Sequence, residues 1–156
     1  KYDSRDTHKP GWKFNEYELK GVPLRIGIGP RDLENGTVEL ARRDTLTKEV
    51  VQMEGIAELI KAKLDDIQVN LYNKAKTYRD ENTRPANSWD EFKDLIENTG
   101  GFVEAHWDGT AETEDKIKDL TKATIRCIPL DAKQQEGKCI LTGNPSTQRV
   151  LFAKAY

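Results

Sequence analysis

The clearest pattern of hydrophobic and polar positions lies between residues 21 and 47. Apolar residues alternate with small or polar ones from residue 22 to 28, which predicts a half-buried strand. Pro30 ends this strand, because proline has no N–H to give to a sheet. The Asn35-Gly36 pair predicts a turn, and residues 37–43 predict a second strand with a basic end. We therefore expect a hairpin of two paired strands in this stretch.

Helical periodicity is strongest between residues 51 and 82. Apolar residues recur there at steps of three and four, which predicts one long amphipathic helix. We expect this helix to cover the sheet and to connect to the segment that follows. A shorter helix is predicted around the aromatic residues Trp12, Phe14 and Tyr17, and Gly21 would end it.

The residues after the long helix predict a second, smaller α/β unit. Arg84-Pro85 breaks the helical pattern, and Ser88 with Glu91 has the spacing of a capping box that opens another helix. The further elements expected are a helix end at Gly100-Gly101, strands over 102–107, 124–128 and 149–156, and a helix over 112–122. The expected core consists of Trp89, Phe92, Phe102, Trp107, Ile128 and Phe152. We therefore predict an α/β (α+β) protein with two domains, 1–84 and 85–156.

Composition narrows the classes of function. Charged residues make up 33% and hydrophobic residues 36% of the 156 residues, and the formal net charge is −2. A balance so close to neutrality recruits neither nucleic acid nor a membrane by net charge alone. No apolar run reaches membrane-spanning length and no signal-peptide pattern opens the chain, so we expect a cytoplasmic protein without a membrane partner.

Motifs for catalysis are absent from the sequence. Residues 27–31 lack the third glycine of a phosphate-binding loop, and Pro30 removes an N–H that would point at an anion. His8 and His106 belong to no spacing typical of a catalytic base. We therefore expect no catalytic residue in this chain.

Arginine side chains gather at the predicted margin of the first sheet, with acidic residues close by in sequence. Guanidinium groups mixed with carboxylates match the donor and acceptor edges of unpaired bases. On spacing alone, a hairpin with solvated charges is the alternative. The residues concerned are Arg25, Arg31, Asp32, Arg42, Arg43 and Asp44.

Residues 11–45 resemble the C-terminal part of the prolyl-tRNA synthetases of the archaeal and eukaryotic-like type. The similarity continues through residues 100–110, 123–131 and 137–156, and so covers nearly the whole chain. It implies an anticodon-binding domain, a mixed sheet flanked by helices, followed by the family's small C-terminal domain. It also implies that a first strand and helix, and the catalytic domain, precede residue 1, so that the chain is a fragment without catalysis.

The resemblance implies partners and cofactors for the full-length enzyme. It is expected to be a homodimer that uses ATP and magnesium, while this fragment binds the anticodon loop of proline tRNA and contacts its own catalytic domain. Tyr156 matches the family's terminal tyrosine and would dock at the catalytic domain, with a frayed terminus as the alternative. A stand-alone RNA-binding or scaffolding module and a purely structural domain are the other readings of the same sequence.

Proline anticodons carry two guanines, which present N7 and O6 as acceptors and N1 and N2 as donors. Arg25 and Arg31 are the expected donors, and Glu18 and Asp32 the expected acceptors. Many relatives carry a glutamate where this chain has Gly27, so Glu18 is the candidate to replace it. The residues expected to hold phosphates or stack on a base are Trp12, Lys13, Arg42, Arg43 and Lys48.

The family's C-terminal domain often binds zinc through two cysteine pairs. The matching positions here are Asp108, Thr113, Cys139 and Thr142. Three of the four thiolates are missing, and threonine hydroxyls are poor zinc ligands, so we predict no bound zinc. Cys127 lies outside this group and is expected to be a buried strand thiol.

Overall fold

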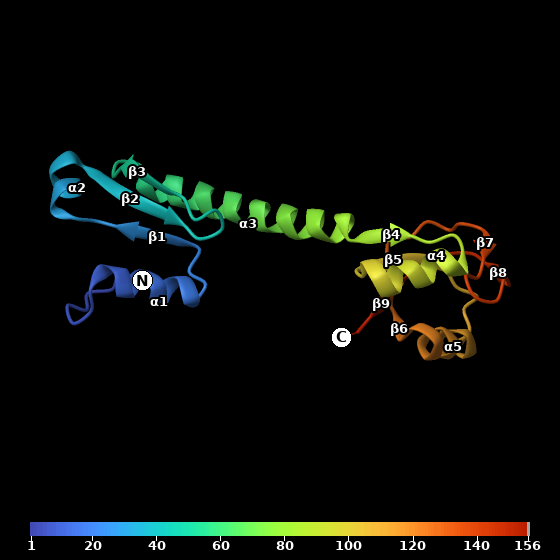
Figure 1. The fold of residues 1–156 in the computed structure, drawn as a ribbon. Coiled ribbons are helices and arrows are strands. Elements are labelled where there is room, and N and C mark those ends of the chain that lie inside the picture. The colour runs from blue at the N-terminus through green and yellow to red at the C-terminus, as the bar shows by residue number, and fades with distance from the viewer. Residues whose placement is uncertain (156) are drawn as a thin grey trace. The chain divides into compact units, whose positions relative to one another are not determined.

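The computed structural model describes residues 1–155 and divides the chain into two compact units, Lys1–Ala75 and Lys76–Tyr156 (Figure 1). Each unit combines helices with a sheet, which confirms the mixed α/β fold class. None of the described helices has the length and apolar character that a membrane crossing requires.

The N-terminal unit is a three-stranded antiparallel sheet with helices. Its elements are α1 (Pro10–Leu19), β1 (Leu24–Gly27), α2 (Pro30–Asn35), β2 (Thr37–Arg42), β3 (Lys48–Gln52) and the start of α3 (Ile56–Glu81). The strand order is β1-β2-β3. The predicted first helix and the first two strands are therefore confirmed, but the segment between the strands contains the helix α2 and is not a simple hairpin turn.

The predicted start of the long helix at residue 51 is wrong, because a strand comes before the helix. Residues 48–52 form β3, paired with β2 in the register Val38↔Val51, and α3 begins at Ile56. The apolar positions at the start of the helical pattern fit a strand equally well, and the free edge of β2 provides the partner.

Alternation along the strands gives the sheet two distinct faces. Val38 and Leu40 point to one face, where they are buried together with Ile67 of α3. Arg25 and Lys48 point to the other face, where both cations lie over the ring of Phe14 from α1. Figure 1 shows α1 running beside β1. The two helices thus pack on opposite faces of one sheet.

The C-terminal unit is a four-stranded sheet in the order β4-β5-β9-β6, with a separate two-stranded ribbon. β4 runs parallel to β5, and the other pairs are antiparallel. Its elements after α3 are β4 (Thr83–Pro85), α4 (Trp89–Asp94), the π-helical turn η1 (Leu95–Thr99), β5 (Phe102–His106), α5 (Ala111–Thr121), β6 (Ala123–Cys127), β7 (Gly137–Lys138), β8 (Pro145–Ser146) and β9 (Arg149–Lys154).

Local sequence signals explain where these helices begin and end. The Ser88 side chain accepts a hydrogen bond from the Glu91 N–H at 3.3 Å, as the capping pattern predicts. The Glu91 carboxylate accepts from the Asn87 N–H at 2.8 Å, one residue earlier than in a capping box. Gly100 and Gly101 follow η1 with φ values of 72° and 83°, which suits glycine.

Aromatic packing forms the core of this unit. Phe92 and Phe152 are fully buried, and their rings meet edge to face at 5.1 Å between centroids. Trp89 stacks on Phe92 at 5.4 Å, and Trp107 packs at the edge of the core.

Two expectations about this core are wrong. Ile128 is 46% exposed, and Cys127 is exposed and not a buried strand thiol. The pairing of β6 with β9 shifts register between Ile125 and Cys127, and β6 is an edge strand. The bulge therefore turns the end of the strand away from the core.

Candidate nucleic-acid interface

All nine residues predicted to contact RNA lie in the N-terminal unit, on α1, β1, α2, β2 and β3 or directly beside them. They are Trp12, Lys13, Glu18, Arg25, Arg31, Asp32, Arg42, Arg43 and Lys48. The structure separates them into side chains with internal partners and side chains that face the solvent.

The Arg25 guanidinium is held against an aromatic ring, and its N–H groups make no hydrogen bond to another described residue. The carbon at the centre of its guanidinium lies 3.5 Å from the centroid of the Phe14 ring, a close cation–π contact. Its Nη1 atom is buried and has no hydrogen-bond partner among residues 1–155. A buried donor left unpaired is unfavourable, so the Arg25 guanidinium gains free energy if it turns toward an acceptor that a ligand brings to the surface.

Lys48, on the far strand of the sheet, places a second cation near the Phe14 ring. The Lys48 ammonium lies 5.9 Å from the Phe14 ring and 3.4 Å from the Glu39 carboxylate. The hollow between α1 and the sheet, beside Tyr17 and Arg25, has a volume of only about 20 Å³. It is too small for a nucleobase, so a base would have to lie on the open surface.

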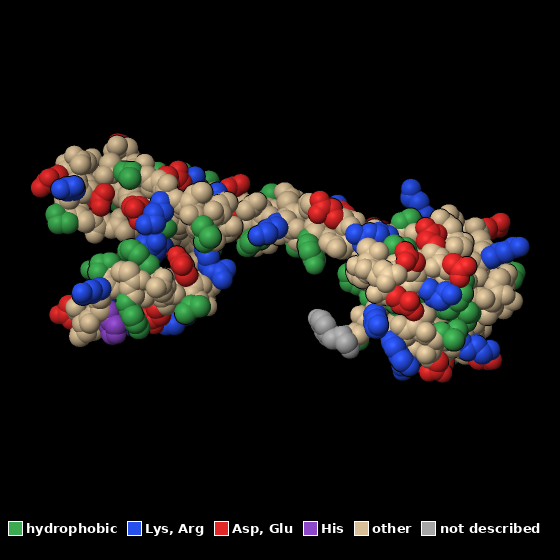
Figure 2. Space-filling view, in the orientation of Figure 1, with side chains coloured by type: hydrophobic (Ala, Val, Ile, Leu, Met, Phe, Trp, Pro, Cys, Tyr) green, Lys and Arg blue, Asp and Glu red, His purple; other side chains and the backbone are tan. Residues whose placement is uncertain are grey.

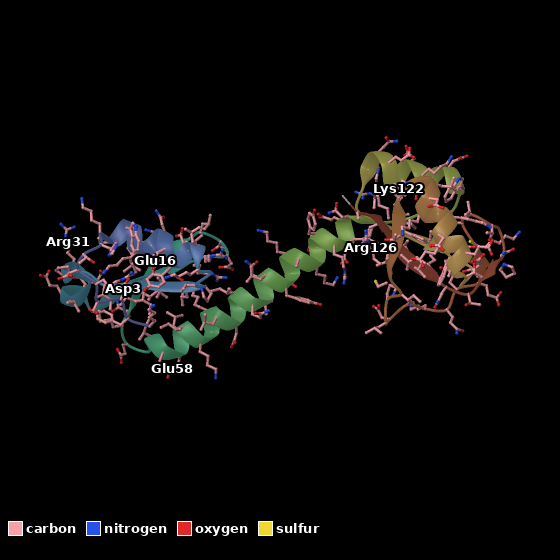
Figure 3. The ribbon with its side chains drawn as sticks, turned by 90° about the horizontal axis from the view of Figure 1, so that it is seen from below. Asp3, Glu16, Arg31, Glu58, Lys122 and Arg126 are labelled. Carbon is pink, nitrogen blue, oxygen red and sulfur yellow. The ribbon has the colours of Figure 1, made fainter. Side chains whose placement is uncertain are left out.

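Arg31 and Asp32 open α2 and differ in their surroundings. Figure 3 shows Arg31 at the rim of the N-terminal unit, where it is exposed and makes no hydrogen bond or ion pair with another described residue. The Asp32 carboxylate accepts a hydrogen bond from the Gly29 N–H at 2.8 Å and lies 3.5 Å from the Thr37 hydroxyl. Asp32 therefore holds the turn between β1 and α2.

Arg42 and Arg43 both have partners inside the chain. Arg42 pairs with Asp44 at 2.7 Å and also with Asp66 of α3. The hydrogen bond from Arg42 lowers the pKa of the Asp44 carboxyl to about 2. Arg43 donates from Nε to the Glu18 carbonyl at 2.9 Å. These contacts tie β2 to the helices on both faces of the sheet.

The start of the chain carries a charged and aromatic network around α1. Arg5 bridges the Asp3 and Glu16 carboxylates, which lie close together in Figure 3. Its hydrogen bonds hold the pKa of Asp3 well below the usual range and lower the pKa of Glu16. Trp12 is 47% exposed, and the His8 ring lies against it at an interplanar angle of 32°, with 3.9 Å between the ring centroids. The Lys13 ammonium reaches the Asp3 carbonyl at 3.3 Å. Part of the Trp12 surface is thus covered by the chain itself.

A second polar cluster lies in the C-terminal unit around Asp108. One carboxylate oxygen accepts from the hydroxyls of Thr113 at 3.0 Å and Thr142 at 2.9 Å and from the Asn144 amide at 3.2 Å. The other oxygen accepts from the Thr110 hydroxyl at 2.9 Å. Burial by itself raises the pKa of Asp108, but the hydrogen bonds from these threonines outweigh it and lower the pKa to about 2.

Comparison with known proteins finds a matching family model for each of the two units. Residues 1–63 match the family model described as anticodon binding domain, and residues 89–156 match prolyl-tRNA synthetase, C-terminal. The whole chain is 63% identical to a protein of Christiangramia forsetii and 62% identical to proteins of Flavobacterium johnsoniae and Porphyromonas gingivalis, each named proline--tRNA ligase.

The chain belongs to the prolyl-tRNA synthetase family.

It spans about a third of the length of these relatives, between 31% and 32%. Its assignment to the archaeal and eukaryotic-like type stays a prediction from sequence. Tyr156, which matches the family's terminal tyrosine, lies outside the described residues.

The family's zinc site does not fit the residues of this chain. Asp108, Thr113 and Thr142, at three of the four ligand positions, are hydrogen-bonded to one another, and the fourth position holds the buried thiol of Cys139. Among residues 1–155 there is no group of three or more His, Cys, Asp and Glu side chains placed to hold a metal ion. A carboxylate and hydroxyl cluster stands where the family has thiolates, and hydroxyls are weak ligands for zinc.

Sequence reasoning missed three residues that the structure brings into these sites. Phe14, which was not among the residues predicted to contact RNA, lies beneath the cations of Arg25 and Lys48. Glu39 pairs with Lys48, and Asn144 completes the cluster around Asp108. The alternation of β2 provided a signal for Glu39, which is two residues from Ala41, the cross-strand partner of Arg25. No local signal pointed to Asn144.

Proposed function

We propose that this chain recognises the anticodon loop of proline tRNA as the C-terminal part of a proline–tRNA ligase. The observation that carries the proposal is Arg25, which lies against Phe14 with a buried donor that no group within residues 1–155 satisfies. Guanine O6 and N7 are acceptors that a guanidinium bonds well. The match of residues 1–63 to an anticodon binding domain supports the same ligand.

The contacts support different roles for the predicted residues. Arg25 and the exposed Arg31 are the guanine donors, and Glu18, whose carboxylate has no partner in the described part of the chain, is an acceptor at the edge of α1. Trp12 offers a stacking surface. We assign Lys13, Arg43 and Lys48 to phosphates, because each uses only part of its donor groups in contacts within the chain. Arg42 and Asp32 have internal partners, so we assign them to holding the sheet.

The distribution of charge supports specific recognition of a loop over general attraction to nucleic acid. In Figure 2, Lys and Arg side chains are interspersed with Asp and Glu side chains over both units on the face shown. The net charge of −2 agrees with this view. Affinity would then depend on a few base contacts in addition to the salt-dependent phosphate term.

The other properties of the full-length enzyme are part of the same proposal. Activation of proline with ATP and magnesium, and its transfer to tRNA, would be carried out by a catalytic domain outside this chain. The enzyme would be a cytoplasmic homodimer, with Tyr156 docked at its catalytic domain. We assign no role to zinc in this chain, because the residues at the family's ligand positions do not fit the metal.

Binding to RNA stem-loops tests the proposal. We expect the chain to bind a stem-loop with a proline anticodon at least tenfold more tightly than one with a scrambled loop, and replacing either guanine should remove most of this difference. Arg31→Ala should weaken binding, and Lys61→Ala, which removes the same charge from an exposed site on α3, should not. Equal binding of the proline and scrambled loops would favour a stand-alone RNA-binding module, and no salt-dependent binding would favour a structural domain.

A further inference from the structure

One part of the sheet in the N-terminal unit is left open on the face that α1 partly covers. The cross-strand row of Arg25, Ala41 and Lys48 lies near Phe14 of α1. The next row consists of Gly27, Glu39 and Val50, and Val50 is 66% exposed. The second row therefore forms an accessible surface beside the donors of Arg25.

Gly27 has no side chain, so it makes this surface flat. The polar group beside it is the carboxylate of Glu39. The two residues are direct cross-strand partners. A Cβ at position 27 would lie 3.9 Å from the Glu39 Cβ and 4.0 Å from its Oε1 atom. The three atoms nearest to such a Cβ all belong to Glu39, so the Glu39 side chain leans toward the space above Gly27.

The Glu39 carboxylate is oriented by an ion pair, but it can still accept hydrogen bonds from a ligand. Lys48 pairs with it at 3.4 Å, and the two side chains are 54% and 37% exposed. An ion pair this open contributes little to stability, so its acceptor positions can be used by a ligand. By contrast, the Asp32 carboxylate is already bonded to the backbone of its own turn.

We propose that Glu39 recognises the N1–H and N2–H donors of an anticodon guanine that lies over Gly27. The inference rests on the proposed function and names the acceptor within that site. A carboxylate accepts both donors in a paired arrangement, which neither a hydroxyl nor a lysine can do. Arg25 is the diagonal neighbour of Glu39, and such positions in a sheet are about 7–8 Å apart. A base between them meets an acceptor on one side and a donor on the other.

The substitution Glu39→Gln separates this role from a purely electrostatic one. It removes a negative charge and releases Lys48, so if Glu39 only pairs with Lys48, binding to RNA should stay equal or become tighter. If Glu39 accepts from guanine, binding of the proline stem-loop should weaken at least about fivefold, because good paired contacts discriminate at that level or above. Only the contact with guanine predicts weaker binding.

Inosine in place of each guanine identifies the group that Glu39 contacts. Inosine lacks the N2 amine, so the wild-type chain should bind one of the two substituted loops several-fold more weakly, and Glu39→Gln should lose most of that difference. Glu34→Gln, on the exposed side of α2, makes the same charge change and should keep it. Circular dichroism of each variant establishes that the fold is unchanged.

Two results would overturn the inference, and they are distinguishable. If the wild-type chain prefers proline loops but Glu39→Gln binds them as tightly with the same guanine-to-inosine ratio, Glu39 is not the acceptor and the proposed function stands. If the wild-type chain does not distinguish the proline loop from a scrambled loop, the proposed function fails and the role of Glu39 fails with it.

Discussion

Asp44, in the turn after β2, accepts a 2.7 Å hydrogen bond from the amide of Asn70 on α3, 26 residues later in the chain. The same carboxylate is held by Arg42, and its side chain is 1% exposed. A buried carboxylate with these partners fixes the sheet to the helix behind it. The face on which RNA recognition is proposed is the opposite face of this sheet.

Asp44→Asn should therefore loosen the N-terminal unit. Losing a charged hydrogen-bonded pair in a buried position is expected to lower the free energy of unfolding by about 1–3 kcal/mol. Hydrogen exchange at the amides of β2 and of the first turns of α3 measures the effect in this unit alone. Asp65→Asn, at an exposed position of α3, is the matched control and should exchange like the wild type.

The same carboxylate predicts how the unit responds to acid. The hydrogen bond from Arg42 lowers the pKa of Asp44 from 3.8 to about 2, so its contribution to stability is complete above about pH 4. As pH falls from 4 toward 2, Asp44 becomes protonated and this contribution is lost. The difference in unfolding free energy between wild type and Asp44→Asn should shrink over this range. A constant difference down to pH 2 would contradict the prediction.

Arg31 and Arg42 should behave as opposites, although both are arginines of the same sheet margin. Arg31→Ala should leave thermal stability unchanged and weaken binding of the proline stem-loop, because its side chain is exposed and has no partner in the described chain. Arg42→Ala should lower stability, because it leaves the buried Asp44 without its cation. Thermal unfolding and RNA titration of both variants check the division, and the reverse pattern would refute it.

The Asp108 cluster should stabilise the C-terminal unit without a metal. Asp108→Asn is expected to lower the free energy of unfolding by about 1–3 kcal/mol, because a charged acceptor shared by three threonines is lost. Asp115→Asn, at an exposed position of α5, should be neutral. Neither zinc nor a chelator should shift the melting temperature of the wild type. A shift of several degrees with one equivalent of zinc would show that the residues hold the metal after all.

Gly137→Ala should disturb the packing of His106. A Cβ at residue 137 would lie 2.3 Å from Nε2 of the His106 ring, which is buried and bonded to Ser146 at 3.1 Å. The ring has no free space to yield, so we expect a loss of about 1–3 kcal/mol in unfolding free energy. Gly11→Ala, in a helix with nothing within 4 Å, should be neutral or stabilising. Equal effects of the two substitutions would contradict the contact.

Local sequence patterns predicted most elements of both units and misplaced a few of their ends. Period and capping signals placed α1, α5 and β5 close to their observed bounds, and hydrophobicity identified Phe92 and Phe152 as core residues. β3 was missed because Val51, near its end, fits the start of the helical pattern as well as a strand. The free edge of β2, which pairs with β3 across the turn at residues 43–47, decided between the two.

In the candidate site, too, the sequence predicted some properties and tertiary contacts decided the others. The sequence placed the basic residues in one unit, and the family resemblance gave their ligand class. It could not distinguish Arg31, which is exposed, from Arg42, whose carboxylate partner Asp66 comes from a helix 24 residues later. Alternation along β2 places Glu39 on the same face as Ala41, but its pairing with Gly27 is set by the strand register, and Glu39 was overlooked.

The amino-acid sequence by itself determined the family, most of the helices and strands, and the loss of the zinc thiolates. These follow from residue identity and from periodicities of a few residues. The tertiary structure alone decided which buried arginine donors are left unpaired, which carboxylates have partners within the chain, and which face of the sheet is open. Those properties depend on contacts between residues far apart in the chain, and no local pattern encodes such contacts.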